Sequence, residues 1–135
     1  MLKEPLRVSI VDDEASVRDA LARLLKTQSF DAKGFGSAAD FIDSLDEGLP
    51  DCLVVDFHMP GMTGLELQQY LRQAGKVVPT VVITAHDDPK LRQLCKAFGA
   101  SDFLIKPLSN SVLIGAIRKA IDDGFHFAGA LRASD

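Results

Sequence analysis

The chain of 135 residues is short enough to form one domain and long enough to bury a hydrophobic core. Its hydrophobic share of 47% and its charged share of 25% are those of an ordinary globular protein. A net charge of −4 argues against a basic surface for nucleic acid within this chain. The first residues lack the apolar core of a signal peptide and no apolar run is long enough to cross a membrane, so we expect a cytoplasmic protein.

The two cysteines indicate neither a disulfide framework nor a metal site. Cys52 lies in an apolar run and Cys95 lies in a predicted helix. Neither has a Cys or His neighbour at the spacing of metal ligands. We therefore expect both to be buried, reduced thiols.

Short apolar strands alternate with amphipathic helices along the chain. The first helix shows the spacing clearly, because Val17, Leu21, Leu24 and Leu25 recur on one side of the turn. Ser37 is the expected N-cap of the second helix, and Gly48 lies near its end. The remaining boundaries follow from proline, glycine and capping residues. The expected strands are 8–11, 30–35 (weak), 52–55, 80–83 and 102–105, and the other helices are 14–27, 65–74, 87–98 and 109–123.

Repeated β-α units with apolar, β-branched strands predict an α/β protein. Such strands favour a parallel sheet that is covered by helices on both faces. Right-handed crossovers leave few topologies, and the pattern suits a doubly wound, flavodoxin-like sheet of five strands in the order 2-1-3-4-5. We expect one domain over residues 1–124, and residues 125–135, which show no clear period, to form a tail or the start of a linker.

Polar residues follow the apolar strands at the points where these end. Asp12 and Asp13 follow the first strand, Asp56 the third, Thr84 the fourth and Lys106 the fifth. In an open parallel sheet, groups just past the carboxyl ends of the strands share one crevice. A crevice with carboxylates, a hydroxyl and one ammonium group is suited to a divalent cation and to phosphate.

Each acidic residue also has a simpler interpretation. Asp12 and Asp13 precede a helix, where acids commonly cap the first turn, and Asp56 precedes a proline-containing loop. The three together favour a metal site, because clustered carboxylates repel one another and raise their own pKa values unless a cation is present. Mg²⁺ prefers such oxygen ligands.

The chain resembles the receiver domain of bacterial two-component response regulators over residues 7–123. The loop and the last strand end resemble in particular the subfamily with helix-turn-helix transcriptional output. Four motifs carry the resemblance: Val11-Asp12-Asp13-Glu14, Val55-Asp56-Phe57-His58-Met59-Pro60-Gly61-Met62-Thr63-Gly64, Ile83-Thr84-Ala85 and Phe103-Leu104-Ile105-Lys106-Pro107.

This resemblance implies that a histidine kinase transfers a phosphoryl group to Asp56. It implies that Asp13 and Asp56 bind Mg²⁺, or Mn²⁺ in its place, that Asp12 binds it through water, and that the main-chain carbonyl of His58 is a further ligand. Such a domain catalyses only its own phosphotransfer and a slow autodephosphorylation. It is therefore a signalling domain and not an enzyme with a separate substrate.

The resemblance also assigns the groups around the phosphoryl group. Lys106 is expected to pair with Asp56 and then with the phosphoryl group, and the peptide between Lys106 and Pro107 is expected to be cis. The Thr84 hydroxyl and the Ala85 amide are expected to donate hydrogen bonds to the phosphoryl oxygens.

In receivers, the aromatic residue three positions before this lysine turns inward when the threonine moves. That residue is Phe103 here, in place of the commoner tyrosine, so that packing alone sets its rotamer. Thr84 and Phe103 are thus the expected switch. The expected output is homodimerisation through the face of helix 4, strand 5 and helix 5, or control of an output domain. DNA would be bound only by an output domain outside this chain.

Two alternatives come from other classes. An aspartyl-phosphate phosphatase or mutase would use the same nucleophile, but such enzymes typically carry a second acid two residues later, where this chain has His58. A degenerate receiver would act as a constitutive binding module. Loss of Asp56, Thr84 or Lys106 would favour that second alternative, and all three are present.

Overall fold

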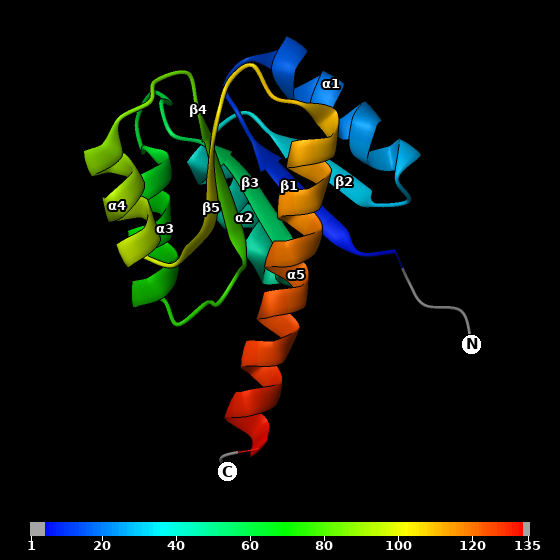
Figure 1. Ribbon diagram of the computed structural model, residues 1–135, viewed down its shortest axis with the longest axis vertical. Coiled ribbons are helices and arrows are strands. Elements are labelled where there is room, and N and C mark those ends of the chain that lie inside the picture. Colours follow the sequence, from blue (N-terminus) through cyan, green and yellow to red (C-terminus); the bar gives the residue numbers. More distant parts are fainter. Residues whose placement is uncertain (1–4, 134–135) are drawn as a thin grey trace.

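The computed structural model describes residues 5–133, with side chains through residue 124. The strands are β1 (Arg7–Val11), β2 (Asp31–Phe35), β3 (Cys52–Asp56), β4 (Thr80–Thr84) and β5 (Ala100–Ile105). The helices are α1 (Ala15–Thr27), α2 (Ala38–Ser44), a short 3₁₀ helix η1 (Leu45–Glu47), α3 (Gly64–Gln73), α4 (Pro89–Ala97) and α5 (Asn110–Ala133). Figure 1 shows strands and helices alternating along the chain.

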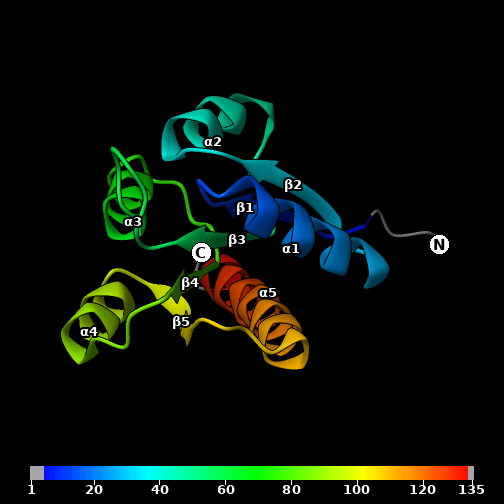
Figure 2. The ribbon, with the colours of Figure 1, turned by 90° about the horizontal axis from the view of Figure 1, so that it is seen from above.

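The strands form one five-stranded sheet in the order β2-β1-β3-β4-β5. Every neighbouring pair is parallel. The predicted fold class and strand order are therefore confirmed. Seen from above, α2, α3 and α4 lie on one side of the sheet, and α1 and α5 lie on the other (Figure 2).

Each face of the sheet has its own hydrophobic core. On one face α1 and α5 cover the sheet, with Leu25 and Ile117 fully buried. On the other face α2, α3 and α4 cover it, with Phe41 and Leu67 fully buried. The central strands β3 and β4 are buried along their whole length, because both of their faces are covered.

The second strand gave a weak signal because it lies at the edge of the sheet. Only Ala32 is buried among the residues of β2, whereas Asp31, Lys33 and Gly34 are exposed. An edge strand with charged residues is protected against pairing with other chains, and it lacks the apolar run of a central strand. Its glycine also indicates close approach by another group.

The last helix is longer than predicted. The sequence indicated an end at Asp123, whereas α5 continues to Ala133. The prediction ended there because the residues from Gly124 onward show no clear period. A Cβ at Gly124 would lie 2.7 Å from Cγ of Pro79, so this glycine allows the helix to pass close to the residue before β4. Whether residues 125–135 serve as a tail or a linker stays a prediction; residues 134–135 lie outside the described part.

Two boundaries shift for local reasons. The helices α3 and α5 begin within one residue of the predicted starts at 65 and 109. In contrast, α4 begins at Pro89 and not at 87 as predicted. The Asp88 side chain caps this helix by accepting a hydrogen bond from the Lys90 N–H. The predicted strand 102–105 starts earlier, at Ala100, where the pairing with β4 is irregular. Ser37 caps α2 as expected.

Among the described residues, no helix is both long enough and apolar enough to cross a membrane. Cys52 and Cys95 are free and buried, as expected from the sequence. Burial and, to a smaller extent, the nearby Asp51 charge raise the pKa of the Cys52 thiol to about 12. This group is therefore not a reactive thiolate.

Candidate functional site

The acidic residues at the ends of β1 and β3 meet as the topology predicts. Carboxylate oxygens of Asp12, Asp13 and Asp56 all lie within 4.8 Å of one another. Asp56 is the last residue of β3, and β1 is its parallel neighbour, so the two strand ends are side by side. Asp12 is fully buried and Asp13 is exposed, so that the cluster is open to solvent on the side of Asp13.

The buried Asp12 has all its polar groups engaged. Its N–H donates to the Phe35 carbonyl at 3.1 Å, and its carbonyl accepts from Arg18 Nη1 at 2.7 Å. Its Oδ1 accepts from the Glu14 N–H at 2.9 Å, which is the local turn bond expected of an aspartate before a helix. Its Oδ2 lies 3.5 Å from Lys106 Nζ. The turn-forming and metal-binding interpretations of Asp12 are thus compatible.

Lys106 reaches across the crevice to the acids. Its Nζ lies 3.7 Å from Oδ1 of Asp56 and 3.5 Å from Oδ2 of Asp12. The peptide between Lys106 and Pro107 is cis, as expected. The Lys106 N–H donates to the Thr84 carbonyl at 2.7 Å, which fixes the end of β5 against the end of β4.

The pKa of the Asp56 carboxyl is raised above its ordinary value of 3.8. Burial is the largest cause, because it removes the carboxylate from water. The nearby Lys106 ammonium lowers the pKa, while the charges of Asp12 and Asp13 raise it. The one ammonium group therefore compensates the negative charge only in part.

This arrangement fits a hard divalent cation. Three clustered carboxylates and an opening to solvent supply oxygen ligands and leave room for water, as Mg²⁺ requires. That Asp13 and Asp56 bind such an ion directly stays a prediction. The contribution of the His58 carbonyl stays a prediction.

Thr84 and Ala85 lie at the end of β4, beside the acids. The Thr84 side chain is fully buried, and its Oγ1 accepts a hydrogen bond from the His86 N–H at 3.1 Å. The backbone beyond β3 is tied to β4, because the Phe57 N–H donates to the Ile83 carbonyl at 2.8 Å. Ala85 is exposed. The roles of Thr84 and Ala85 toward a phosphoryl group stay predictions.

The proposed aromatic switch residue faces inward. Phe103 is 2% exposed and belongs to the core beneath α4. The guanidinium of Arg92, on α4, lies 5.2 Å from the centroid of its ring. This contact connects β5 to α4. The structure holds one position of the ring, so its movement stays a prediction.

Two histidine rings meet at the mouth of the crevice. The ring of His58 lies edge-to-face against His86, with centroids 5.1 Å apart, and against Phe57, with centroids 4.8 Å apart. These residues follow β3 and β4, so the contact joins the two loops that border Asp56. Both histidines are exposed.

The start of α3 packs directly on the backbone of Asp56. A Cβ at Gly64 would lie 3.1 Å from the Asp56 carbonyl oxygen and 3.1 Å from the Phe57 Cα. Thr63 and Glu66 form a reciprocal capping box at this helix terminus. Glycine at this position therefore allows the helix to begin next to the acid.

The sequence did not predict that Arg18 contacts the backbone of the acid cluster. No motif in the sequence marks Arg18 of α1, yet it donates to the Asp12 carbonyl. The available signal was Gly34 in the interior of a strand, which marks a close approach by another group. Without the fold, that signal does not reveal the identity of the group.

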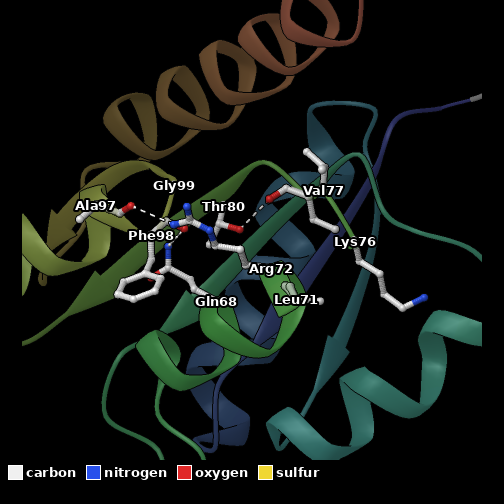
Figure 3. A pocket seen from close by; sticks show the side chains of 10 residues that line it. Gln68, Leu71, Arg72, Lys76, Val77, Thr80, Ala97, Phe98 and Gly99 are labelled. Atoms are coloured by element: carbon white, nitrogen blue, oxygen red, sulfur yellow. Dashed lines mark hydrogen bonds between the residues drawn. The ribbon is translucent and has the colours of Figure 1, made fainter. Parts of the chain in front are cut away.

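A separate cavity lies away from these acids. It has a volume of about 390 Å³ and lies between the C-terminal ends of α3 and α4, beside the start of β4 (Figure 3). Gln68, Arg72, Phe98 and Thr80 are among its lining residues, and no acidic residue lines it. The cavity and the acid cluster are at opposite ends of the strands, and the chemistry belongs to the cluster.

The comparisons with known proteins agree with this geometry. The family model for the response regulator receiver domain matches residues 8–118. The chain belongs to the response regulator receiver family. Receivers are signalling domains and not classical enzymes.

The relatives include transcriptional regulators. The transcriptional regulatory protein TdiR of Thauera aromatica is 40% identical over 84% of this chain and 50% of its own length. The transcriptional regulatory protein FixJ of Azorhizobium caulinodans is 37% identical over 89% of this chain and 57% of its own length. The chain thus spans about half the length of the curated relatives it matches.

Solved structures of receivers have the same fold. The crystal structure of FixJ-N superposes with a TM-score of 0.82 at 36% identity, covering 89% of this chain and 96% of that chain. The response regulator StyR gives a TM-score of 0.84 at 34% identity, covering 97% of this chain and 66% of that chain.

Proposed function

We propose that this receiver accepts a phosphoryl group on Asp56 from the phosphohistidine of a partner histidine kinase, in a reaction that requires Mg²⁺. The observation that carries the proposal is the convergence of three carboxylates and one ammonium group at the ends of three strands, β1, β3 and β5. Asp56 lies beside the other two acids and Lys106, and it ends the central strand β3.

In the proposed step, an oxygen of the Asp56 carboxylate attacks phosphorus. A P–O bond forms to the carboxylate, the P–N bond to the kinase imidazole breaks, and its electron pair stays on the imidazole nitrogen. Bound Mg²⁺ would be held by Asp13 and Asp56, by Asp12 through water and by the His58 carbonyl, and it would neutralise negative charge on the transferring group.

This chain's own residues supply the remaining charge and hydrogen bonds. Lys106 would leave Asp56 and contact a phosphoryl oxygen, because the phosphoryl dianion carries more charge than the carboxylate. The Thr84 hydroxyl would exchange its bond with the His86 N–H for a bond to the phosphoryl group. The Ala85 N–H would be a second donor.

The proposed consequence is a shift of a pre-existing equilibrium in the face formed by α4, β5 and α5. Phe103 contacts Arg92 of α4, so movement of Thr84 and Phe103 would be transmitted to that helix. The output would be homodimerisation through this face or release of an output domain. Because relatives are transcriptional regulators about twice as long, we propose a DNA-binding output domain. In that arrangement residues 1–124 are the receiver, and residues 125–135 begin the connection.

The test is incubation with acetyl phosphate and Mg²⁺, read by intact mass spectrometry. We expect the mass of one phosphoryl group on the wild-type chain, none on Asp56→Asn, and none when the metal is removed by a chelator. Asp43→Asn, an exposed aspartate on α2, is the matched control and should be modified like the wild type.

The outcomes separate the alternatives. An unmodified wild type together with unchanged α4 would favour the constitutive binding module. Sustained release of phosphate from small phosphoesters, dependent on Asp56 and His58, would favour the phosphatase. Modification that persists in Asp56→Asn would assign the acceptor to another residue.

A further inference from the structure

The end of strand β2 leaves a channel that a single arginine fills. A Cβ at Gly34 would lie 2.6 Å from Cγ of Arg18 and 2.9 Å from its Cδ. A Cβ at Gly36 would lie 3.4 Å from Arg18 Nη1. The glycines on either side of Phe35 therefore make room for this side chain, which crosses the strand from α1. No function described above accounts for them.

The arginine ends at the acidic turn. Arg18 Nη1 donates to the Asp12 main-chain carbonyl at 2.7 Å. The Asp12 N–H donates to the Phe35 carbonyl at 3.1 Å. Both main-chain groups of Asp12 thus have partners, the N–H on β2 and the carbonyl on α1.

Asp13 depends on this backbone for its position. Within the described part of the chain, its carboxylate makes no hydrogen bond or ion pair, and its side chain is exposed. The Asp12 carbonyl belongs to the peptide unit that joins Asp12 to Asp13. Rotation of that peptide would swing the Asp13 carboxylate relative to Asp56.

We propose that Arg18 is a positioning residue for the divalent cation, and that Gly34 serves to admit it. By fixing the peptide between Asp12 and Asp13, Arg18 would hold the Asp13 carboxylate within reach of an ion that Asp56 also binds. This proposal rests on the proposed function, because it assigns a role within the same cation site.

The direction in which removal of Arg18 changes the Mg²⁺ affinity distinguishes a positioning role from a purely electrostatic role. A positive guanidinium close to the acids disfavours a cation by Coulomb repulsion. If Arg18 acted through its charge, its removal would therefore strengthen Mg²⁺ binding. If it acts through position, its removal weakens Mg²⁺ binding.

The first measurement is the dissociation constant for Mg²⁺ alone, from titration of backbone amide resonances. We expect Arg18→Ala to raise that constant by about tenfold, the lower end of the range for groups that orient metal ligands. Arg18→Lys, which keeps a donor on a long stem, should restore part of the loss. Arg23→Ala, an exposed arginine of the same helix, is the matched control and should bind like the wild type.

The second measurement tests the channel. Gly34→Ala places a methyl group where the Arg18 stem now lies, so it should weaken Mg²⁺ binding about as much as Arg18→Ala. In the Arg18→Ala background the stem atoms are gone, and Gly34→Ala should cause no further loss. The double-mutant cycle is then strongly non-additive. Gly115→Ala, at an open position on α5, is the control for adding a methyl group.

Urea unfolding of every variant without metal distinguishes lost binding from lost folding, and binding is compared only where the protein is folded. Unchanged or tighter Mg²⁺ binding by Arg18→Ala would overturn the proposal. So would a Gly34→Ala loss of equal size with and without Arg18. A wild-type chain that binds no Mg²⁺ would instead refute the proposed function itself.

Discussion

Single residues of the acid cluster are stabilised unequally. Asp12 is fully buried but has a partner for each polar group, whereas Asp56 has raised pKa because burial outweighs the attraction of Lys106. The ionised Asp56 carboxylate therefore lowers the stability of the folded protein when no cation is bound. A bound cation would relieve this unfavourable interaction.

Replacing Asp56 should stabilise the metal-free protein. We expect Asp56→Asn to raise the free energy of unfolding at neutral pH by about 1 kcal/mol, the usual size of a point-mutation effect. The measurement is urea unfolding in a chelating buffer, with Asp43→Asn as the exposed control. An equal or lower stability of Asp56→Asn would contradict the charge argument.

The pH dependence of that gain has a definite sign. The carboxyl group in the folded protein has a pKa above 3.8, the ordinary value. Below pH 3.8 the group is protonated in both the folded and the unfolded state and has no effect on stability. As the pH rises from there through the raised folded-state pKa, the wild type loses stability relative to Asp56→Asn. The gain should therefore grow with pH and then level off, and a gain that shrinks would contradict it.

At the scale of the elements, side-chain hydrogen bonds from two residues of α3 connect this helix to the C-terminal end of α4. The Gln68 Nε2 donates to the Cys95 carbonyl at 3.2 Å and to the Phe98 carbonyl at 3.5 Å. Figure 3 shows Gln68 and Phe98 side by side. Arg72 adds a bond from Nη1 to the Ala97 carbonyl at 3.4 Å, and its guanidinium lies 5.7 Å from the centroid of the Phe98 ring. These groups hold the C-terminal end of α4, the helix that the proposed switch moves.

Gln68→Leu should loosen that end without unfolding the domain. The Gln68 Oε1 is buried and has no hydrogen-bond partner within the described residues, so the substitution removes an unsatisfied acceptor along with the donor. We expect global stability to change little. The amides of Phe98 and Gly99 should exchange about fivefold faster, which corresponds to the loss of about 1 kcal/mol of local stability.

The measurement is native-state hydrogen exchange. Gln73→Leu, on the exposed end of the same helix, is the matched control and should leave exchange of these amides unchanged. Equal exchange in Gln68→Leu and the wild type would show that the Gln68 hydrogen bonds do not hold this end of α4.

At the scale of the whole molecule, the proposed function requires the acid site to influence a face built from other elements. In that proposal the path would begin with Thr84, at the end of β4, and pass through Phe103 to Arg92, whose guanidinium contacts the Phe103 ring. Exposed apolar side chains lie on the two helices of that face, with Leu94 45% exposed on α4 and Val112 53% exposed on α5. Such side chains favour association with a second surface.

Phosphorylation should therefore change this face and no other. With acetyl phosphate and Mg²⁺, we expect altered amide exchange in α4, β5 and the first turns of α5, and little change in α1 and α2. Sedimentation velocity of the same sample tests homodimerisation through this face. Asp56→Asn under the same conditions is the control. Changes spread evenly over the molecule would contradict a localised switch.

The sequence by itself determined the order of strands and helices and the identity of the central strands. β3 and β4 are buried on both faces, so they read as continuous apolar runs that differ from any helix. The positions of Asp12, Asp13, Asp56, Thr84 and Lys106 followed from the rule that strand ends in a parallel sheet share one edge. Local patterns carry this information because it depends on neighbours in the chain.

Only the tertiary structure decided the contacts between segments that are distant in sequence. The proposed role of Arg18 depends on Gly34 in β2 and on Gly36 just after that strand, and Gly124 lets α5 pass close to Pro79. In both cases a glycine is required because a side chain from a distant segment occupies the space where its Cβ would lie. The identity of that side chain is known only once the fold has brought the segments together. Periodicity reports which face of an element is buried, but not what is buried against it.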